Sequence, residues 1–146
     1  MAASLIAQKM RQRVGAYFEA CGRQDARAVA ACFTPHAVHY LPHHPPIQGG
    51  GAIGAAIVEE LRSRGGAYFV DKVLTDSEQF AAAVEWSRTY RQGDRILRGY
   101  EFYEFDPASG LGREIRGYYA AAPAPEKARH EMVGFDYVSR GYKTLP

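Results

Sequence analysis

The sequence predicts an α+β fold in which helices come first and an antiparallel sheet follows. Apolar residues recur at helical spacing through most of the first 65 residues. From residue 67 to about residue 121 the spacing changes to an alternation of period two, which is typical of strands with one buried face. The order of helix, helix, strand, helix and then several strands is an α+β plan. A curved sheet covered by helices on one face leaves a cavity between the two layers.

Length and composition favour one globular domain. The chain has 146 residues, of which 47% are hydrophobic and 23% are charged, an ordinary globular balance. We expect a single domain over residues 1–146, with a core at about 5–121 and a C-terminal extension at 122–146. The net charge is +2 and the charges are interspersed, so the composition gives no sign of a nucleic-acid partner.

The sequence gives no indication of export or of membrane insertion. Gln8, Lys9 and Arg11 interrupt the apolar residues near the N-terminus, unlike a signal peptide. No stretch is long and apolar enough to span a bilayer. Cys21 and Cys32 are predicted to be free, buried thiols, as in a reducing compartment. We therefore expect a soluble cytoplasmic protein with no membrane partner.

Three helices are predicted in the first half of the chain. The first covers residues 5–21, the second 26–33 and the third approximately 52–63. Asp25 is a suitable N-cap for the second helix, and the glycines that follow Arg64 end the third.

Four strands are predicted in the second half. They cover residues 67–74, 80–90, 96–105 and 113–121, with turns at 91–94 and 106–112 between them. A short strand-like piece is predicted around Phe135–Val138 in the C-terminal extension.

The segment Phe33–Gly50 is the most distinctive stretch of the chain. It begins as a short strand around Ala37 and contains four of the five histidines: His36, His39, His43 and His44. The prolines that follow are expected to end strand pairing, because proline has no N–H to donate. Imidazole titrates closest to neutral pH, which makes a stiff, histidine-rich turn suited to proton transfer. The alternative is a polar surface loop.

Four segments together resemble the NTF2-like superfamily, and more narrowly its SnoaL-like polyketide cyclases and ketosteroid isomerases. They are YFEACGRQDARAVAACFTPHAVHY, GGGAIGAAI, RGYEFYEFDPASG and REIRGYY. The resemblance implies a cone of three N-terminal helices packed on a curved, mostly antiparallel sheet that encloses a pocket. It also implies a homodimer formed through the outer sheet face. It does not specify one reaction, since this fold hosts several.

The resemblance to ketosteroid isomerases implies roles for particular residues. Tyr17 lies eight residues before Asp25, as the oxyanion-donating tyrosine of that family does, and Glu101 occupies the position of the second oxyanion donor. The position of the family's catalytic base is Leu41, so a neighbouring histidine is expected to take that role. His39 shares a strand face with Leu41 and ranks first, and His43 ranks second. The alternative for His39 is a structural, hydrogen-bonded histidine.

Other residues are expected to complete the pocket. The predicted substrate-binding residues are Tyr40, His44, Trp86, Arg116 and Tyr118. Tyr17 on an amphipathic helix is also typical of core packing, and an outward Glu101 would pair with Arg98 or Arg116.

No metal site or covalent nucleophile is predicted. The histidine spacing matches no standard metal site, and adjacent residues in a proline-rich turn seldom converge on one ion. The chain has no GxSxG motif, and Gly49–Gly51 lacks the pattern of a phosphate-binding loop.

These observations predict a cofactor-free general acid/base enzyme acting on a small, partly hydrophobic carbonyl, enol or hydroxylated cyclic compound. The expected reaction is an isomerisation, dehydration or cyclisation, with a histidine as base and Tyr17 and Glu101 supporting the oxyanion. One alternative is a hydrolase that adds water to an epoxide or ring on the same scaffold. The other is a non-catalytic small-molecule-binding or dimerisation domain. Convergence of ionisable residues inside a cavity would favour an enzyme.

Overall fold

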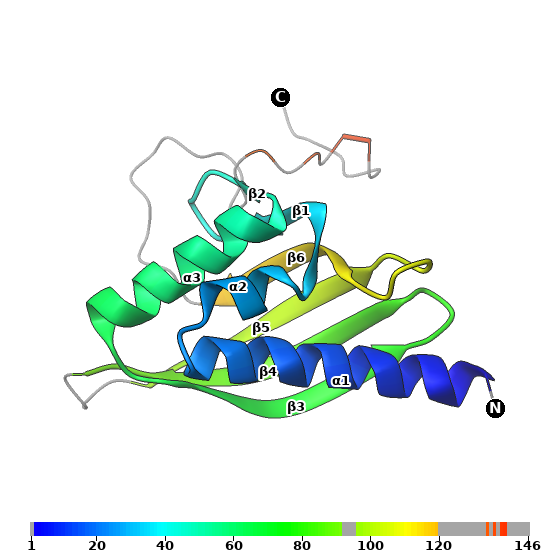
Figure 1. The fold of residues 1–146 in the computed structure, drawn as a ribbon, viewed down its shortest axis with the longest axis horizontal. Helices are drawn as coiled ribbons and strands as arrows, with labels where there is room; N and C mark the ends of the chain where they lie inside the picture. Colours follow the sequence, from blue (N-terminus) through cyan, green and yellow to red (C-terminus); the bar gives the residue numbers. More distant parts are fainter. Residues whose placement is uncertain (1, 92–95, 120–133, 135, 137, 140–146) are drawn as a thin grey trace.

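The computed structural model describes residues 2–91, 96–119, 134, 136, 138 and 139 (Figure 1). Its helices and strands are, in chain order, α1 (Ala2–Gly22), α2 (Ala26–Ala30), β1 (Phe33–Tyr40), β2 (Ile47–Gln48), α3 (Gly50–Arg64), β3 (Tyr68–Asp76), β4 (Ala81–Thr89), β5 (Ile96–Phe105) and β6 (Gly112–Tyr119). The predicted turn at 91–94 and the predicted strand around Phe135–Val138 lie largely outside the described residues.

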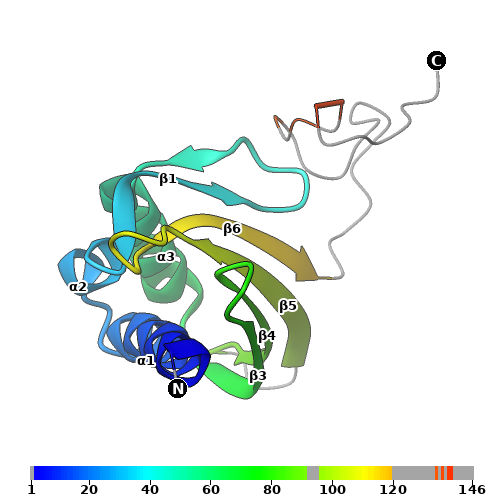
Figure 2. The ribbon, with the colours of Figure 1, turned by 90° about the vertical axis from the view of Figure 1, so that its right-hand side faces the viewer.

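The strands form one six-stranded sheet in the order β2-β1-β6-β5-β4-β3. β1 and β6 are parallel, and every other neighbouring pair is antiparallel. The sheet is curved and open, and the three helices lie on its concave side (Figures 1 and 2). This arrangement confirms the predicted α+β fold with a mostly antiparallel sheet.

The segment around β1 differs from the sequence prediction. The second helix ends at Ala30 rather than at residue 33, and β1 already begins at Phe33. Pro35 therefore lies inside a strand, between the pairs Phe33–Gly112 and Val38–Glu114, where the register shifts. Such an irregularity accommodates a residue without an N–H. The later prolines end β1, as expected, but the chain then turns back and pairs through β2, which was not predicted.

Local signals fix the helix ends and the contact between helices. Asp25 caps α2 by accepting a hydrogen bond from the Ala28 N–H at 3.0 Å, as predicted. Gly65, with φ of 66°, ends α3. Gly54 lets α3 approach α2 closely, because a Cβ atom there would lie 2.2 Å from the Ala26 carbonyl oxygen. These contacts set the position of α3 over the sheet.

The core lies between the helices and the concave face of the sheet. Tyr17 of α1 packs edge-on against Phe33 and Tyr103, with ring centroids 5.4 and 6.1 Å apart. Cys21 and Cys32 are buried and not disulfide-bonded.

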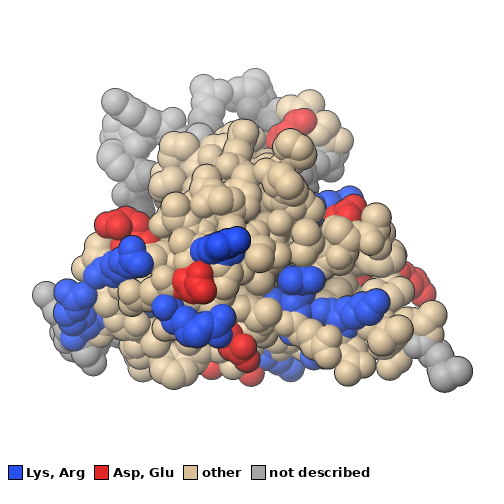
Figure 3. Space-filling model, in the orientation of Figure 1, with Lys and Arg blue, Asp and Glu red and all other residues tan. Residues whose placement is uncertain are grey.

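Basic and acidic side chains are intermingled on the face viewed in Figure 3. No helix of the described chain is long and apolar enough to cross a membrane.

Candidate functional site

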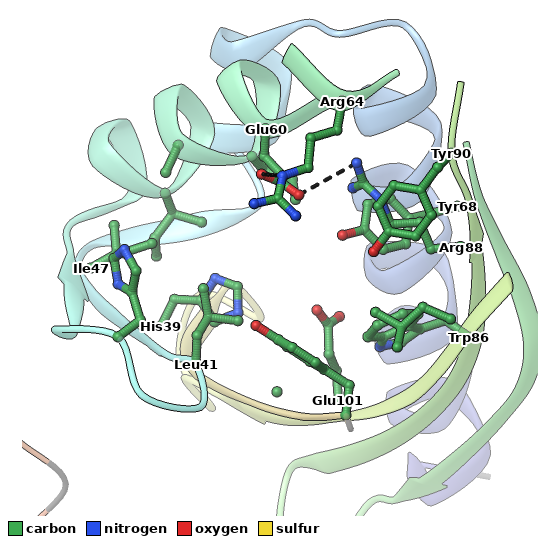
Figure 4. Close-up of a pocket in the computed structure, with 17 residues that line it drawn as sticks. His39, Leu41, Ile47, Glu60, Arg64, Tyr68, Trp86, Arg88, Tyr90 and Glu101 are labelled. Carbon is green, nitrogen blue, oxygen red and sulfur yellow. Dashed lines mark ion pairs between the residues drawn. The ribbon is translucent and has the colours of Figure 1, made fainter. Parts of the chain in front are cut away.

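A cavity of about 310 Å³ lies between α3 and the concave face of the sheet (Figure 4). Its apolar lining consists of Leu41, Ile47, Ile53, Ala56, Ile57 and Leu97. Its polar and aromatic lining consists of His39, His44, Glu60, Arg64, Tyr68, Trp86, Arg88, Tyr90, Glu101 and Tyr119. The volume is at the small end of the range for ligand sites, and a mainly apolar wall with a few polar groups is typical of such sites.

Strand alternation explains which side chains reach the cavity. Successive side chains of a strand point to opposite faces, so residues two apart share a face. His39 and Leu41 both line the cavity, in agreement with the shared face expected for them. Trp86 and Arg88 do the same from β4, and Leu97 and Glu101 from β5.

Glu101 is the only cavity-lining carboxylate on a strand among the described residues, and it is 7% exposed. Burial raises its pKa to about 7, and the hydrogen bond donated by the Tyr103 hydroxyl opposes part of that rise. The carboxyl group therefore exchanges its proton near neutral pH. Tyr103 was missed by sequence reasoning, although its position two residues after Glu101 on the same strand face was an available signal.

His39 lies on β1 and is 4% exposed. Its Nε2 atom has no hydrogen-bond partner among the described residues. Burial, and to a smaller degree the nearby His44, lower its pKa to about 4. The imidazole is therefore neutral at pH 7. It points into the same cavity as the Glu101 carboxyl group (Figure 4).

Trp86 forms a wall of the cavity because a glycine faces it. Gly99 pairs with Trp86 across β4 and β5, and a Cβ atom at Gly99 would lie 2.5 Å from the indole Cζ2 atom. The absence of a side chain at Gly99 lets the indole lie flat over β5. The predicted placement of Trp86 at the pocket is what the structure has.

Arg88 is a charged residue of the site that sequence reasoning missed. It is 1% exposed, and its guanidinium group lies 4.8 Å from the ring centroids of both Tyr68 and Tyr90. An arginine in a strand is ordinarily a solvent-facing residue, which is why the sequence alone did not single it out. Its spacing of two from Trp86 was the signal that could have placed it inside.

Of the other predicted site residues in the N-terminal half, only some line the cavity. His44 is exposed and lines the cavity. His43 is exposed and is not among the described lining residues, and neither is Tyr40. Tyr17 is buried in the core against Tyr103, outside the lining of the cavity. Of the residues proposed as bases, the structure therefore brings only His39 to Glu101's cavity.

Arg116 and Tyr118 are not brought to the cavity. On β6 it is Gly117 and Tyr119 that line the cavity, so the even-numbered neighbours point to the opposite face. There Arg116 pairs with Glu104 at 2.9 Å and with Glu114, and it lies over the Phe102 ring. The sequence placed these two residues one position out of phase.

No group of three or more His, Cys, Asp or Glu side chains within the described parts of the chain is arranged to hold a metal ion. The polar side chains that line the cavity can transfer protons and form hydrogen bonds. A carboxyl group that titrates near neutrality and a neutral imidazole share an apolar cavity, which is an arrangement suited to general acid/base catalysis.

Comparison with known proteins identifies the family. The model of the SnoaL-like domain matches residues 14–118. A protein of unknown function with a cystatin-like fold from Methylobium petroleophilum PM1 is 36% identical, with a TM-score of 0.86 over 96% of this chain and 94% of that one. No curated protein matches the chain.

Two more distant structures share the fold. A candidate ketosteroid isomerase from Kribbella flavida is 20% identical, with a TM-score of 0.67 over 96% of this chain and 92% of that one. An LEH-like epoxide hydrolase from M. tuberculosis is 18% identical, with a TM-score of 0.63 over 78% of this chain and 84% of that one. The fold is thus the NTF2-like cone. Because the family model covers well over half of its length, the chain belongs to the SnoaL-like domain family.

Proposed function

We propose that the protein is a general acid/base enzyme acting on a small, partly hydrophobic cyclic carbonyl, enol or hydroxylated compound. The observation that carries the proposal is Glu101, a buried carboxyl group inside an apolar cavity with a pKa of about 7. A general base works best when its pKa lies near the working pH. The neighbouring folds include a candidate ketosteroid isomerase and an epoxide hydrolase, and both names fit proton-transfer chemistry.

In the proposed reaction the Glu101 carboxylate removes a proton from a carbon next to the substrate carbonyl. The carbonyl oxygen then gains negative charge, and the resulting Glu101 carboxylic acid returns the proton to another position or to a leaving hydroxyl group. The first outcome is an isomerisation and the second a dehydration. The hydroxyl group of Tyr103 donates to Glu101 and holds it in position.

We assign His39 the role of hydrogen-bond donor to the oxyanion rather than that of the base. Its pKa of about 4 makes the neutral imidazole a weak base at pH 7. A neutral imidazole still has one N–H to donate, and in the tautomer with the hydrogen on Nε2, which has no partner among the described residues, it suits a developing oxyanion. This assignment reverses the roles expected from the sequence for His39 and Glu101.

Hydrogen–deuterium exchange at the carbon next to a carbonyl tests this proposal. In D₂O, proton NMR would follow the loss of the hydrogens next to the carbonyl group. The probes would be cyclic ketones, among them 3-oxocyclohexanecarboxylate, and cyclic diketones. The E101Q variant should lose activity by about 100-fold or more, the usual contribution of a positioned base. The matched control is E104Q, because Glu104 lies on the same strand but pairs with arginines on the other face.

If the wild-type protein catalyses exchange and the E101Q variant catalyses it equally fast, Glu101 is not the base. If the wild-type protein exchanges none of the probes above the buffer rate, the non-catalytic binding domain becomes the better description. Opening of a small epoxide, followed on the same samples, would identify the hydrolase alternative.

We also propose that the protein forms a homodimer through the convex face of the sheet. No helix of the described chain covers this face (Figure 2). Its exposed apolar side chains include Phe69, Leu74, Ile96, Tyr100 and Tyr118. Several exposed apolar side chains on a sheet face without a helix over it are typical of an interaction surface.

A further inference from the structure

The cavity has a second polar end, formed by Glu60, Arg64, Tyr68, Arg88 and Tyr90, which we call the arginine end (Figure 4). Glu60 and Arg64 come from the last turns of α3, and the other three come from β3, β4 and the residue that follows β4. The proposed reaction makes no use of this end, although it contains the most deeply buried charge of the cavity, Arg88.

The described residues use only part of the hydrogen-bonding capacity of Arg88, whose partners are the Gly65 carbonyl, Glu60 and the Tyr68 side chain. Its Nη2 atom donates to the Gly65 carbonyl oxygen at 3.3 Å and lies 3.5 Å from Glu60 Oε1. Its Nε and Nη1 atoms have no hydrogen-bond partner among the described residues. Buried polar atoms are nearly always hydrogen-bonded. Two nitrogens without an acceptor on one buried guanidinium group therefore indicate that a hydrogen-bond acceptor is missing.

The charges at the arginine end are also unbalanced. Glu60 is shared between two cations, since its Oε2 atom lies 3.4 Å from Arg64 Nε while its Oε1 atom faces Arg88. Both distances exceed those of a strong charge-assisted hydrogen bond. Among the described lining residues the only other carboxyl group is Glu101, which the proposed reaction uses. Within the described residues, two guanidinium groups and one carboxylate give this end one surplus positive charge, with Arg88 buried and Arg64 mostly exposed.

The surroundings of Arg88 favour a flat, singly charged partner. The rings of Tyr68 and Tyr90 each lie 4.8 Å from its guanidinium carbon, which holds the group by cation–π contact. A guanidinium group matches the planar geometry of a carboxylate. One surplus positive charge matches one carboxylate, whereas a phosphate dianion would remain undercompensated.

We propose that the arginine end binds a carboxylate group of the ligand, with Arg88 as the main partner and Arg64 as the second. The substrate class is therefore a small cyclic compound that has a carboxylate at one end and a reacting carbonyl or hydroxyl group at the other. Apolar side chains such as Ile57 and Leu97 contact the ring between them. Calling this ligand a substrate rests on the proposed function, while the binding of a carboxylate does not.

Tryptophan fluorescence provides the test, because Trp86 is the only tryptophan of the chain and lines the cavity. Cyclohexanecarboxylate and its neutral isostere cyclohexanecarboxamide would be titrated into the full chain at neutral pH. The carboxylate should bind about 10-fold tighter or more, as expected for a charge-assisted contact. The R88M variant should lose this preference, and R62M should keep it, because Arg62 is an exposed residue of α3 that does not line the cavity.

A second variant guards against simple misfolding of R88M. The E60Q change leaves Arg88 in place and removes the carboxylate that competes with the ligand, so it should tighten carboxylate binding several-fold. Carboxamide binding should stay the same. Equal affinity of the wild-type protein for both probes, or weaker carboxylate binding by E60Q, would overturn the inference.

The test separates this inference from the proposed function. E101Q should retain the preference for carboxylate, because Glu101 lies outside the arginine end. A carboxylate preference without deuterium exchange would leave a carboxylate-binding domain that is not an enzyme. Exchange without a carboxylate preference would remove only the assignment of the arginine end.

Discussion

At the scale of single residues, burial changes the pKa values of Glu101 and His39 in opposite directions. Removal from water disfavours whichever form carries charge, so the pKa of the carboxyl group rises to about 7 and that of the imidazole falls to about 4. The sequence made the histidine the natural candidate for the base, because its unperturbed pKa lies nearest to neutrality. In the cavity the carboxyl group has taken that place, a reversal that depends on depth of burial and could not be predicted from residue type.

The raised pKa of Glu101 makes stability depend on pH. The folded protein holds this proton more tightly than the unfolded chain, so the contribution is full below the ordinary value of 4.5 and is lost as the pH rises through about 7. The E101Q variant does not titrate at this position. The free energy of unfolding of E101Q minus that of the wild type, each measured in urea, should therefore increase by roughly 2 kcal/mol between pH 5 and pH 8.

The E104Q variant is the control for this comparison. Burial alone would raise the pKa of Glu104, but hydrogen bonds from Arg116 and Arg113 outweigh that effect and lower it. Its contribution is therefore constant between pH 5 and pH 8. A difference between E101Q and the wild type that does not vary with pH would show that Glu101 titrates as an ordinary glutamate.

At the scale of secondary-structure elements, the phase of each strand decides which residues reach the site. The sequence placed His39 and Leu41 correctly on one face, because two residues of a regular strand can be related to each other by counting. It could not relate β6 to that face, and Arg116 and Tyr118 were assigned to the pocket although they lie on the convex side. The phase of β6 is fixed by its pairing with β1 and β5, which is a property of the sheet and not of the segment.

The convex face of the sheet leads to a prediction about assembly. Leu74 is exposed on this face, where it pairs across from Ala83 on β4. If the face forms a homodimer, light scattering after size exclusion should give twice the 16.2 kDa mass of the chain. L74E should shift the protein to the single-chain mass, because burying an unpaired charge at an interface is costly. L5E is the matched control, since Leu5 is an equally exposed leucine of α1. A wild-type protein with the single-chain mass would refute the dimer.

At the scale of the whole molecule, the fold was more predictable than the site. Hydrophobic periodicity is repeated over many residues, so the helices, the later strands and the α+β plan could be predicted from it. The cavity arises only where α3, placed by its close contact with α2 at Gly54, faces β1, β4, β5 and β6 together. Arg88 and Glu101 meet in it from separate strands. No local pattern contains that convergence, which explains why Glu101 was given a secondary role and Arg88 none.

The proposed function depends on Glu101 exchanging its proton near neutral pH inside this cavity. A ¹³C NMR titration of glutamate side-chain carboxyl groups measures this directly, with the E101Q variant used to assign the signal. We expect a midpoint of about 7 for Glu101. A midpoint near the ordinary value of 4.5 would contradict this expectation and remove Glu101 as the acid/base group.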